Sequence, residues 1–207
     1  MLPKALLILA LIPVCLWTGC SNQSASKQTI VAKLDDPWTD EIVDMLLETG
    51  ARVVCEVKIE QGDTLLDGTC TASMQGIVQT INYRDGQLDG PWKVWHPNGV
   101  LAHEASYEKK KQVGRDVSWD EGGHKVAESH WLDGKKDGLG TVWDKNQHVV
   151  ARIFWVNDEP TKLEQYKDGR LANVLEGSEA KTFLRERALE RVREMSGVGV
   201  DESSAAH

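Results

Sequence analysis

Short runs with strand character alternate with turn signals along most of the chain. The runs are rich in β-branched and aromatic residues, and Gly, Asn or Asp, which tolerate the positive φ of tight turns, follow most of them. A strand and a turn about every 12 residues predict successive antiparallel β-hairpins joined as a meander. The predicted strands are Val78–Tyr83, Pro91–Trp95, Val100–Tyr107, Arg115–Trp119, Lys125–Trp131, Leu139–Trp143 and Val149–Trp155.

Evenly spaced aromatic residues mark the ends of these runs. Eight of the 13 aromatic residues form a ladder with steps of 12 residues and a last step of 11: Tyr83, Trp95, Tyr107, Trp119, Trp131, Trp143, Trp155 and Tyr166. Such regularity indicates an internal repeat. Because neighbouring strands run in opposite directions, we expect two files of rings along opposite margins of the sheet. The rings either pack over turn glycines and join the hairpins, or one file is exposed and binds a sugar or a protein.

Two successive strands with their turns make a unit of 24 residues, which resembles a known repeat. The stretch Tyr83-x-x-Gly86-x-x-x-Gly90-x-Trp92-x-x-Trp95-x-x-x-Gly99 is similar to the MORN-repeat variant of bacteria, and the resemblance covers about residues 76–175. Lys110, Asp116 and Gln147 depart from the pattern, where better repeats have Gly, Trp and Gly. The resemblance implies an elongated repeat scaffold, and some members of the family are described as antitoxins. The turn glycines of the repeats are Gly86, Gly90, Gly99, Gly114, Gly123, Gly134, Gly138 and Gly169.

An amphipathic helix is predicted on each side of the repeats. In the segment 37–50, the residues Trp38, Ile42, Met45, Leu46 and Thr49 fall at helical spacing, and Gly50 would end a helix over about 39–48. We expect this helix to cap the sheet; the alternative is a partner-binding helix.

The second helix is predicted over about 179–195, within the segment 176–197, with Ser178 as N-cap. Its expected stripe comprises Phe183, Leu184, Ala188, Val192 and Met195. Residues 198–207 are expected to form a disordered tail. The fold class is therefore mainly β: an elongated, single-layer antiparallel β-meander over residues 51–175, flanked by two helices.

Two cysteines lie in the predicted hairpin that precedes the repeats. With Gly62-Asp63 as its turn, Cys55 and Cys70 are directly opposed. A disulfide is expected in an oxidising compartment. Free buried thiols and a metal pair are the alternatives, although no histidine neighbours the two cysteines.

The N-terminus indicates export and lipid anchoring. A short basic start is followed by an apolar run, Ala5–Trp17, with the length of a signal sequence rather than of a membrane span. Trp17-Thr18-Gly19-Cys20 resembles the bacterial lipobox, whose cysteine is lipidated; Trp17 stands where Leu is usual. Residues 1–19 are then a lipoprotein signal peptide, and residues 20–36 are Cys20 and a flexible tether. An ordinary secretory signal is the alternative.

Charge and motifs narrow the function. The formal net charge is −8, and loss of Lys4 with the signal makes the mature chain more acidic still, which argues against nucleic acid as a partner. The chain has no catalytic motif such as a nucleophile elbow or a P-loop, and its scattered histidines indicate strand surfaces rather than a metal site. We therefore expect that the protein is not an enzyme and that it binds no cofactor and no metal.

The expected function is non-catalytic. The sequence predicts an interaction or scaffold protein that is anchored by lipid, at the outer membrane facing the periplasm, and binds an unidentified protein. The alternatives are an antitoxin-like or immunity-like binder of a protein toxin, and a protein that binds cell-wall glycan through exposed Trp and Tyr side chains.

Overall fold

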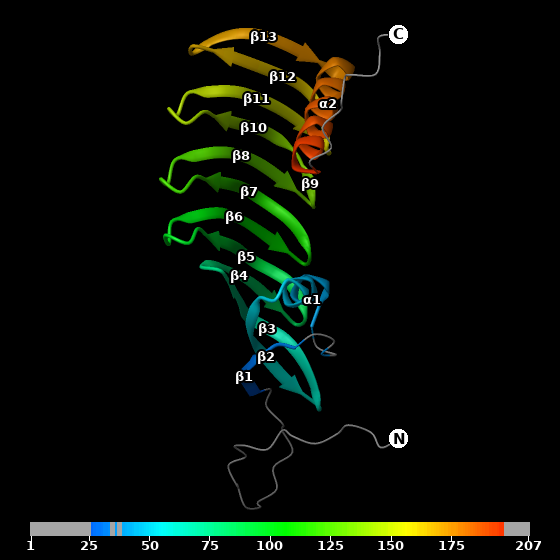
Figure 1. Ribbon diagram of the computed structural model, residues 1–207. Coiled ribbons are helices and arrows are strands. Elements are labelled where there is room, and N and C mark those ends of the chain that lie inside the picture. The colour runs from blue at the N-terminus through cyan, green and yellow to red at the C-terminus, as the bar shows by residue number, and fades with distance from the viewer. Residues whose placement is uncertain (1–25, 34–35, 37–38, 197–207) are drawn as a thin grey trace, which may run out of the picture.

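The computed structural model describes residues 26–33, 36 and 39–196, and these form one open antiparallel sheet with two helices (Figure 1). The strands follow one another in chain order across the sheet, from β1 to β8 and then from β10 to β13; the short β9 pairs with β8. Their bounds are β1 Ser26–Val31, β2 Arg52–Glu60, β3 Asp63–Met74, β4 Ile77–Arg84, β5 Gln87–Trp95, β6 Leu101–Glu108, β7 Lys111–Trp119, β8 Lys125–Leu132, β9 Lys135–Lys136, β10 Gly138–Trp143, β11 Val149–Val156, β12 Glu159–Lys167 and β13 Arg170–Glu176.

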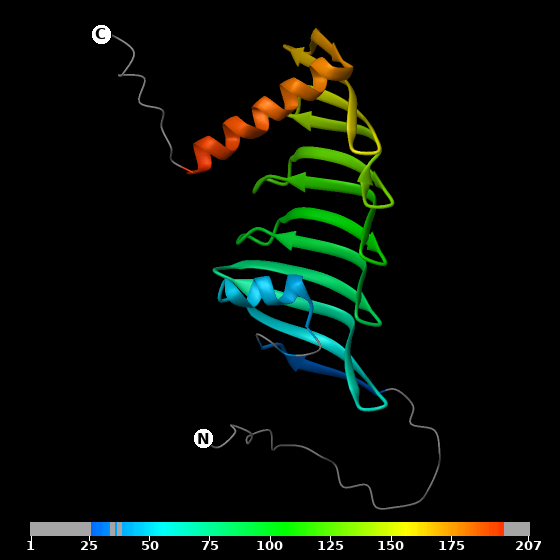
Figure 2. The ribbon, with the colours of Figure 1, turned by 90° about the vertical axis from the view of Figure 1, so that its right-hand side faces the viewer.

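The sheet is long and one layer thick. Twelve strands lie on the path from β1 to β13, and at the usual spacing of about 4.8 Å they extend over roughly 50 Å. Both views show this stack of hairpins, with the helices α1, Glu41–Glu48, and α2, Gly177–Ser196, near its two ends (Figures 1 and 2). The predicted fold class, an elongated β-meander with one helix before and one after the repeats, is confirmed.

Two-residue turns connect several pairs of neighbouring strands. Asp85-Gly86, Asp133-Gly134 and Asp168-Gly169 have positive φ at both residues, the geometry of a hairpin turn that matches the twist of its strands. Lys109-Lys110 has the same geometry, with φ of 47° and 69°, although neither residue is glycine. The repeat therefore imposes the turn even where its sequence has drifted.

The first strand corrects the expected tether. Residues 20–36 were predicted to be flexible, but Ser26–Val31 forms β1 and pairs with β2 along its whole length. Ile30 lies opposite Cys55 and packs against the core, and Ala32 is buried. The sequence before the helix is polar enough to resemble a linker, yet two apolar side chains are sufficient to fix it to an available sheet edge. Residues 20–25 lie outside the described residues.

The disulfide between Cys55 and Cys70 is confirmed, but the predicted turn of its hairpin is wrong. The turn is Gln61-Gly62, one residue earlier than Gly62-Asp63. The cysteines are opposed nevertheless, because three residues of β3 lie opposite Glu56 alone.

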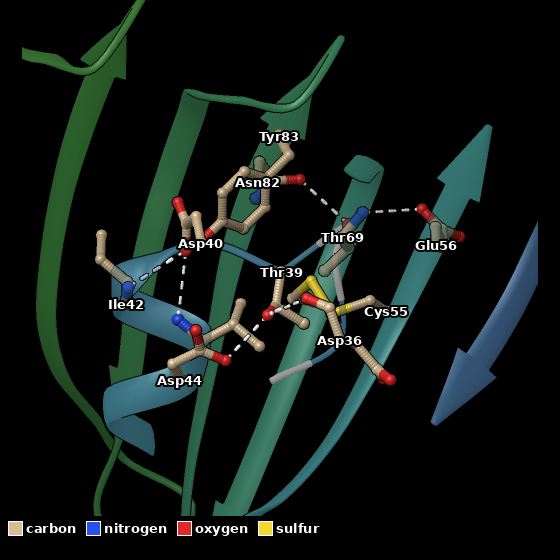
Figure 3. Close-up of a disulfide and its surroundings, with 12 residues drawn as sticks. Asp36, Thr39, Asp40, Ile42, Asp44, Cys55, Glu56, Thr69, Asn82 and Tyr83 are labelled. Carbon is tan, nitrogen blue, oxygen red and sulfur yellow. Dashed lines mark hydrogen bonds between the residues drawn. A yellow bond between two sulfur atoms is a disulfide. The ribbon is translucent and has the colours of Figure 1, made fainter. Parts of the chain in front are cut away.

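That bulge depends on Gly68. Its φ is +130°, and a Cβ atom there would collide with the side chain of Glu56. The Glu56 carboxylate instead accepts a hydrogen bond from the backbone N–H of Thr69 at 2.8 Å (Figure 3). The register of the cysteines thus follows from a β-bulge. The sequence-based prediction assumed a regular hairpin without a bulge.

Helix α1 covers the main hydrophobic core. Val43 is fully buried against the region of the disulfide, and Ile42, Leu46 and Leu47 pack around it. Met45, which the helical spacing placed on the buried face, is 52% exposed. The buried stripe is therefore rotated relative to the predicted one; Trp38 lies outside the described residues.

Helix α2 contacts the sheet only through its beginning. It meets β12 and β13, where Ala180 is fully buried and Lys181 forms an ion pair with Glu159. Figure 2 shows the rest of α2 leaving the sheet on the side that carries α1. The predicted stripe is wrong at Ala188, which is exposed, because this part of α2 diverges from the sheet (Figure 2). The predicted tail lies outside the described residues.

Candidate functional site

The aromatic ladder divides between the two faces of the sheet. Directly paired residues of neighbouring strands share a face, so the pairs Cys70–Ile81, Ile81–Trp92 and Trp92–Ala105 define the face that carries α1. We call it the helix face, and the opposite one the bare face. Strand register places Tyr83, Tyr107, Trp131 and Trp155 on the helix face, and Trp95, Trp119, Trp143 and Tyr166 on the bare face.

At the start of the helix-face file, the rings belong to the core. Tyr83 is buried, and its hydroxyl donates a 2.9 Å hydrogen bond to Asp40, the N-cap of α1 (Figure 3). Burial and the neighbouring Asp40 charge raise the pKa of the Tyr83 phenol well above its ordinary value. Trp92 packs on Tyr107 with their ring centroids 5.9 Å apart. These rings hold α1 and the first repeats together.

Charged side chains contact two rings of the bare-face file, Trp143 and Tyr166. Lys125 lies over the Trp143 ring at 5.5 Å and forms an ion pair with Glu128, which Arg115 also contacts through two hydrogen bonds. The Arg115 hydrogen bond, helped by Lys125, lowers the pKa of Glu128 to about 2. Tyr166 likewise donates a hydrogen bond to Glu164. This file is stabilised by its own surroundings.

Two positions that lie close together within a repeat unit explain a pocket on the helix face. In the first unit, the Trp92 indole N–H donates to Gln79, 13 residues earlier, at 3.1 Å. In the second unit, Asp116 and His103 occupy the same positions and lie 3.0 Å apart.

In the third unit, the same two positions are Gly140 and Ala127. The loss of two large side chains at one place leaves a pocket of about 250 Å³. Its lining comprises Asp116, Ala127, Glu128, Ser129, Trp131, Lys136, Gly140, Thr141, Val142, Ile153 and Trp155.

Two tryptophans and a lysine dominate the chemistry of this pocket. The Lys136 ammonium lies 5.5 Å from the Trp131 ring centroid and 4.9 Å from that of Trp155, within the range of cation–π attraction. Among the described residues, no carboxylate forms an ion pair with Lys136. Trp131 and Trp155 are both half-buried, so part of each ring remains accessible to a ligand.

Asp116 supplies the negative charge at the edge of the pocket. Burial opposes its ionisation, but hydrogen bonds from His103 and Gln112 outweigh that effect, and the Lys136 charge adds to them, so the pKa of Asp116 lies below its ordinary value. The carboxylate is therefore ionised at neutral pH. It faces a lysine across an aromatic-walled pocket.

The turn glycines connect one repeat to the next. All eight predicted positions have positive φ. Around these turns, each hairpin donates a backbone hydrogen bond to the preceding one: Gly86 to Leu66, Lys110 to Leu88, Gly134 to Gln112 and Asp158 to Lys136, at 2.7–2.9 Å. These hydrogen bonds recur in space with the period of the sequence repeat. Lys110 and Asp158 donate them although neither residue is glycine.

The histidines are held by single partners. His96 contacts the Trp119 carbonyl, His130 the Leu139 carbonyl, and His124 and His148 the aspartates four residues before them. No three metal-binding side chains come together within the described part of the chain. Glu128 and His130 alternate along β8 but have different partners, Arg115 and the Leu139 carbonyl.

The sequence analysis missed the pocket although its signal was present. Asp116 was recognised as a departure from the repeat, but Gly140 and Ala127 were not read together with it. Aligning the units shows two positions, 13 residues apart, whose side chains change together from large to small. Lys136 could be identified only from the structure.

No protein-family model matches the chain, and no curated protein matches it. None of the described helices is long and apolar enough to cross a membrane. Cys20 and the signal segment 1–19 lie outside the described residues.

Proposed function

We propose that this protein is a non-catalytic interaction module of the bacterial cell envelope, anchored by lipid at Cys20, which binds a protein partner on its helix face. The observation that carries the proposal is the pocket between Trp131 and Trp155. It is the place where the repeat loses its own filling side chains, and aromatic pockets with a few polar groups are typical centres of protein interfaces.

The two faces differ in a way that supports this choice. On the bare face, Lys125 and Arg152 lie over the rings of Trp143 and Tyr166. Lys125 also forms an ion pair with Glu128, as Arg115 does from the neighbouring strand. On the helix face, Lys136 has no ion-pair partner among the described residues, and the tryptophan rings beside it are half-buried. A partner that binds the helix face can therefore contact both the accessible parts of the tryptophan rings and the Lys136 ammonium.

The length of the array suits an anchored binder. Cys20 precedes Ser26 by six residues, so an extended chain keeps β1 within about 20 Å of a lipid on Cys20. The pocket is lined by residues of β7 to β11, about 35 Å further along the sheet. An outer-membrane lipoprotein facing the periplasm would present the pocket well away from its anchor.

The resemblance to the bacterial MORN-repeat variant is part of the same proposal. An antitoxin-like protein would be a special case, in which the partner is a toxin. Cell-wall glycan is the second candidate ligand, favoured by the tryptophan walls of the pocket, since sugar rings stack on aromatic faces.

Two experiments test the proposal. Replacing Cys20 by Ala should move the protein from the membrane fraction to the soluble fraction; unchanged membrane association would refute the lipid anchor. Pull-down from crosslinked membranes should recover one stoichiometric protein. Recovery of cell-wall material in place of a protein would favour the glycan alternative.

A further inference from the structure

We infer that the pocket between Trp131 and Trp155 takes an aromatic side chain, such as an indole, from the partner protein. This inference rests on the proposed function and names the chemistry of the contact. The protein itself fills the equivalent place in another repeat with its own tryptophan, Trp92.

The first repeat is the template. Trp92 lies on the helix face of β5 and packs against Tyr107 on β6. Its indole N–H donates to Gln79, so the ring is held by a tilted aromatic contact on one side and by a hydrogen bond at its edge. The structure thus shows which group the surface of this repeat accommodates.

The third repeat retains the aromatic wall and lacks the filling group. Trp155 is 48 residues after Tyr107 and corresponds to it, whereas Gly140 replaces Trp92 and Ala127 replaces Gln79. A Cβ atom on Gly140 would lie 3.2 Å from the Trp155 ring nitrogen, so Trp155 leans over part of the space. The remaining pocket of about 250 Å³ has room for about eight waters, a volume that suits one aromatic side chain.

The edge of the pocket supplies the hydrogen bond that Gln79 supplies in the first repeat. Asp116 lines the pocket and accepts bonds from His103 and Gln112, which leaves further lone pairs on its carboxylate oxygens. An indole N–H or a phenol O–H fits this acceptor. Lys136 lies over both tryptophan rings and would contact the π-face of a third ring in the same way.

The second repeat explains why the site occurs once. There the positions of Trp92 and Gln79 hold Asp116 and His103, which bind each other at 3.0 Å and fill their own space. Among these three units, the third alone has small residues at both positions. The site therefore results from two substitutions within one unit of the repeat array.

Nuclear magnetic resonance with a small probe tests the inference. N-acetyl-tryptophanamide, titrated into the soluble Cys20→Ala protein, should cause saturable shifts of the Trp131 and Trp155 indole signals. The Trp119 and Trp143 signals on the bare face should not move. N-acetyl-leucinamide, which lacks a ring, should cause at least tenfold smaller shifts under the same conditions.

Two variants fill the pocket from within, and one serves as a matched control. Ala127→Trp and Gly140→Trp should each weaken probe binding at least tenfold, and two positions are used in case one variant fails to fold. Leu139→Trp places the same side chain on the bare face, opposite Phe154, and should bind the probe as the parent protein does.

The outcomes separate the inference from the proposed function. Absent or non-saturable shifts, or unchanged binding in a folded pocket-filling variant, would overturn the inference. Diacetylchitobiose that shifts the same signals where the indole probe does not would overturn it too, in favour of a sugar site. A partner recovered from membranes would still support the proposed function in either case.

Discussion

Reduction of the Cys55–Cys70 disulfide should destabilise the N-terminal hairpin by about 3 kcal/mol. The bond closes a loop with a sequence separation of 15 residues, and a link of this length removes roughly 3 kcal/mol of chain entropy from the unfolded state. Reduction leaves both sulfur atoms in the core, where Cys55 and Cys70 are 0% and 2% exposed. The change in unfolding free energy therefore reports the link rather than lost packing.

Urea unfolding followed by far-ultraviolet circular dichroism, with and without dithiothreitol, measures this difference. The double variant Cys55→Ala/Cys70→Ala is the control, since dithiothreitol should not change its midpoint. A loss below about 1 kcal/mol in the parent protein would contradict the reasoning, because it would mean that the unfolded hairpin is already closed without the bond.

Hydrogen exchange locates the effect. Stability in a repeat array comes mainly from contacts between neighbouring units, so reduction should lower the protection of amides in β2 and β3 and leave those in β10 and β11 nearly unchanged. An equal loss at both places would show that the array unfolds as one cooperative unit.

Three further changes test the account of stability, each by urea unfolding. Tyr83→Phe removes the hydrogen bond to Asp40 and should cost about 1–2 kcal/mol; an unchanged midpoint would show that the bond contributes nothing. Glu128, with its pKa lowered from 4.5 to about 2, should contribute stability above pH 4.5 that is lost as the pH falls towards 2, and Glu128→Gln should flatten the profile in that window. Lys110→Gly places glycine at a φ of 69° and should stabilise the protein by up to about 1 kcal/mol, whereas destabilisation would show that the lysine side chain matters more than its backbone strain.

The periodicity of the sequence was enough to predict the fold. Regular spacing of Tyr83, Trp95 and their successors fixes where strands end, and Asp-Gly pairs fix where turns lie, because both are local signals with a single geometric meaning. The class of sheet and its connectivity followed from these signals. The disulfide was predicted correctly although the turn assigned to its hairpin was wrong, because the bulge opposite Glu56 brings Cys55 and Cys70 into register. The turn at Lys109-Lys110 shows the limit, since neighbouring hairpins impose it without a local cue.

Other features depend on contacts between distant segments. Strand β1 exists because the edge of β2 is available to Ile30 and Ala32, which no property of a polar linker reveals. The exposed part of α2 follows from the direction of the helix, which leaves the sheet after its contacts with β12 and β13 (Figure 2). The pocket required Gly140 and Ala127 to be recognised as a pair, and their register becomes evident only when the strands are placed side by side.

Site-specific photocrosslinking in intact envelopes tests the central claim, that a protein partner binds the helix face. A photoreactive residue at Ser118, beside the pocket on the helix face, should give one discrete protein adduct, and the same residue at Leu139 on the bare face should give none. Adducts at Leu139 alone, or at neither position, would contradict the account.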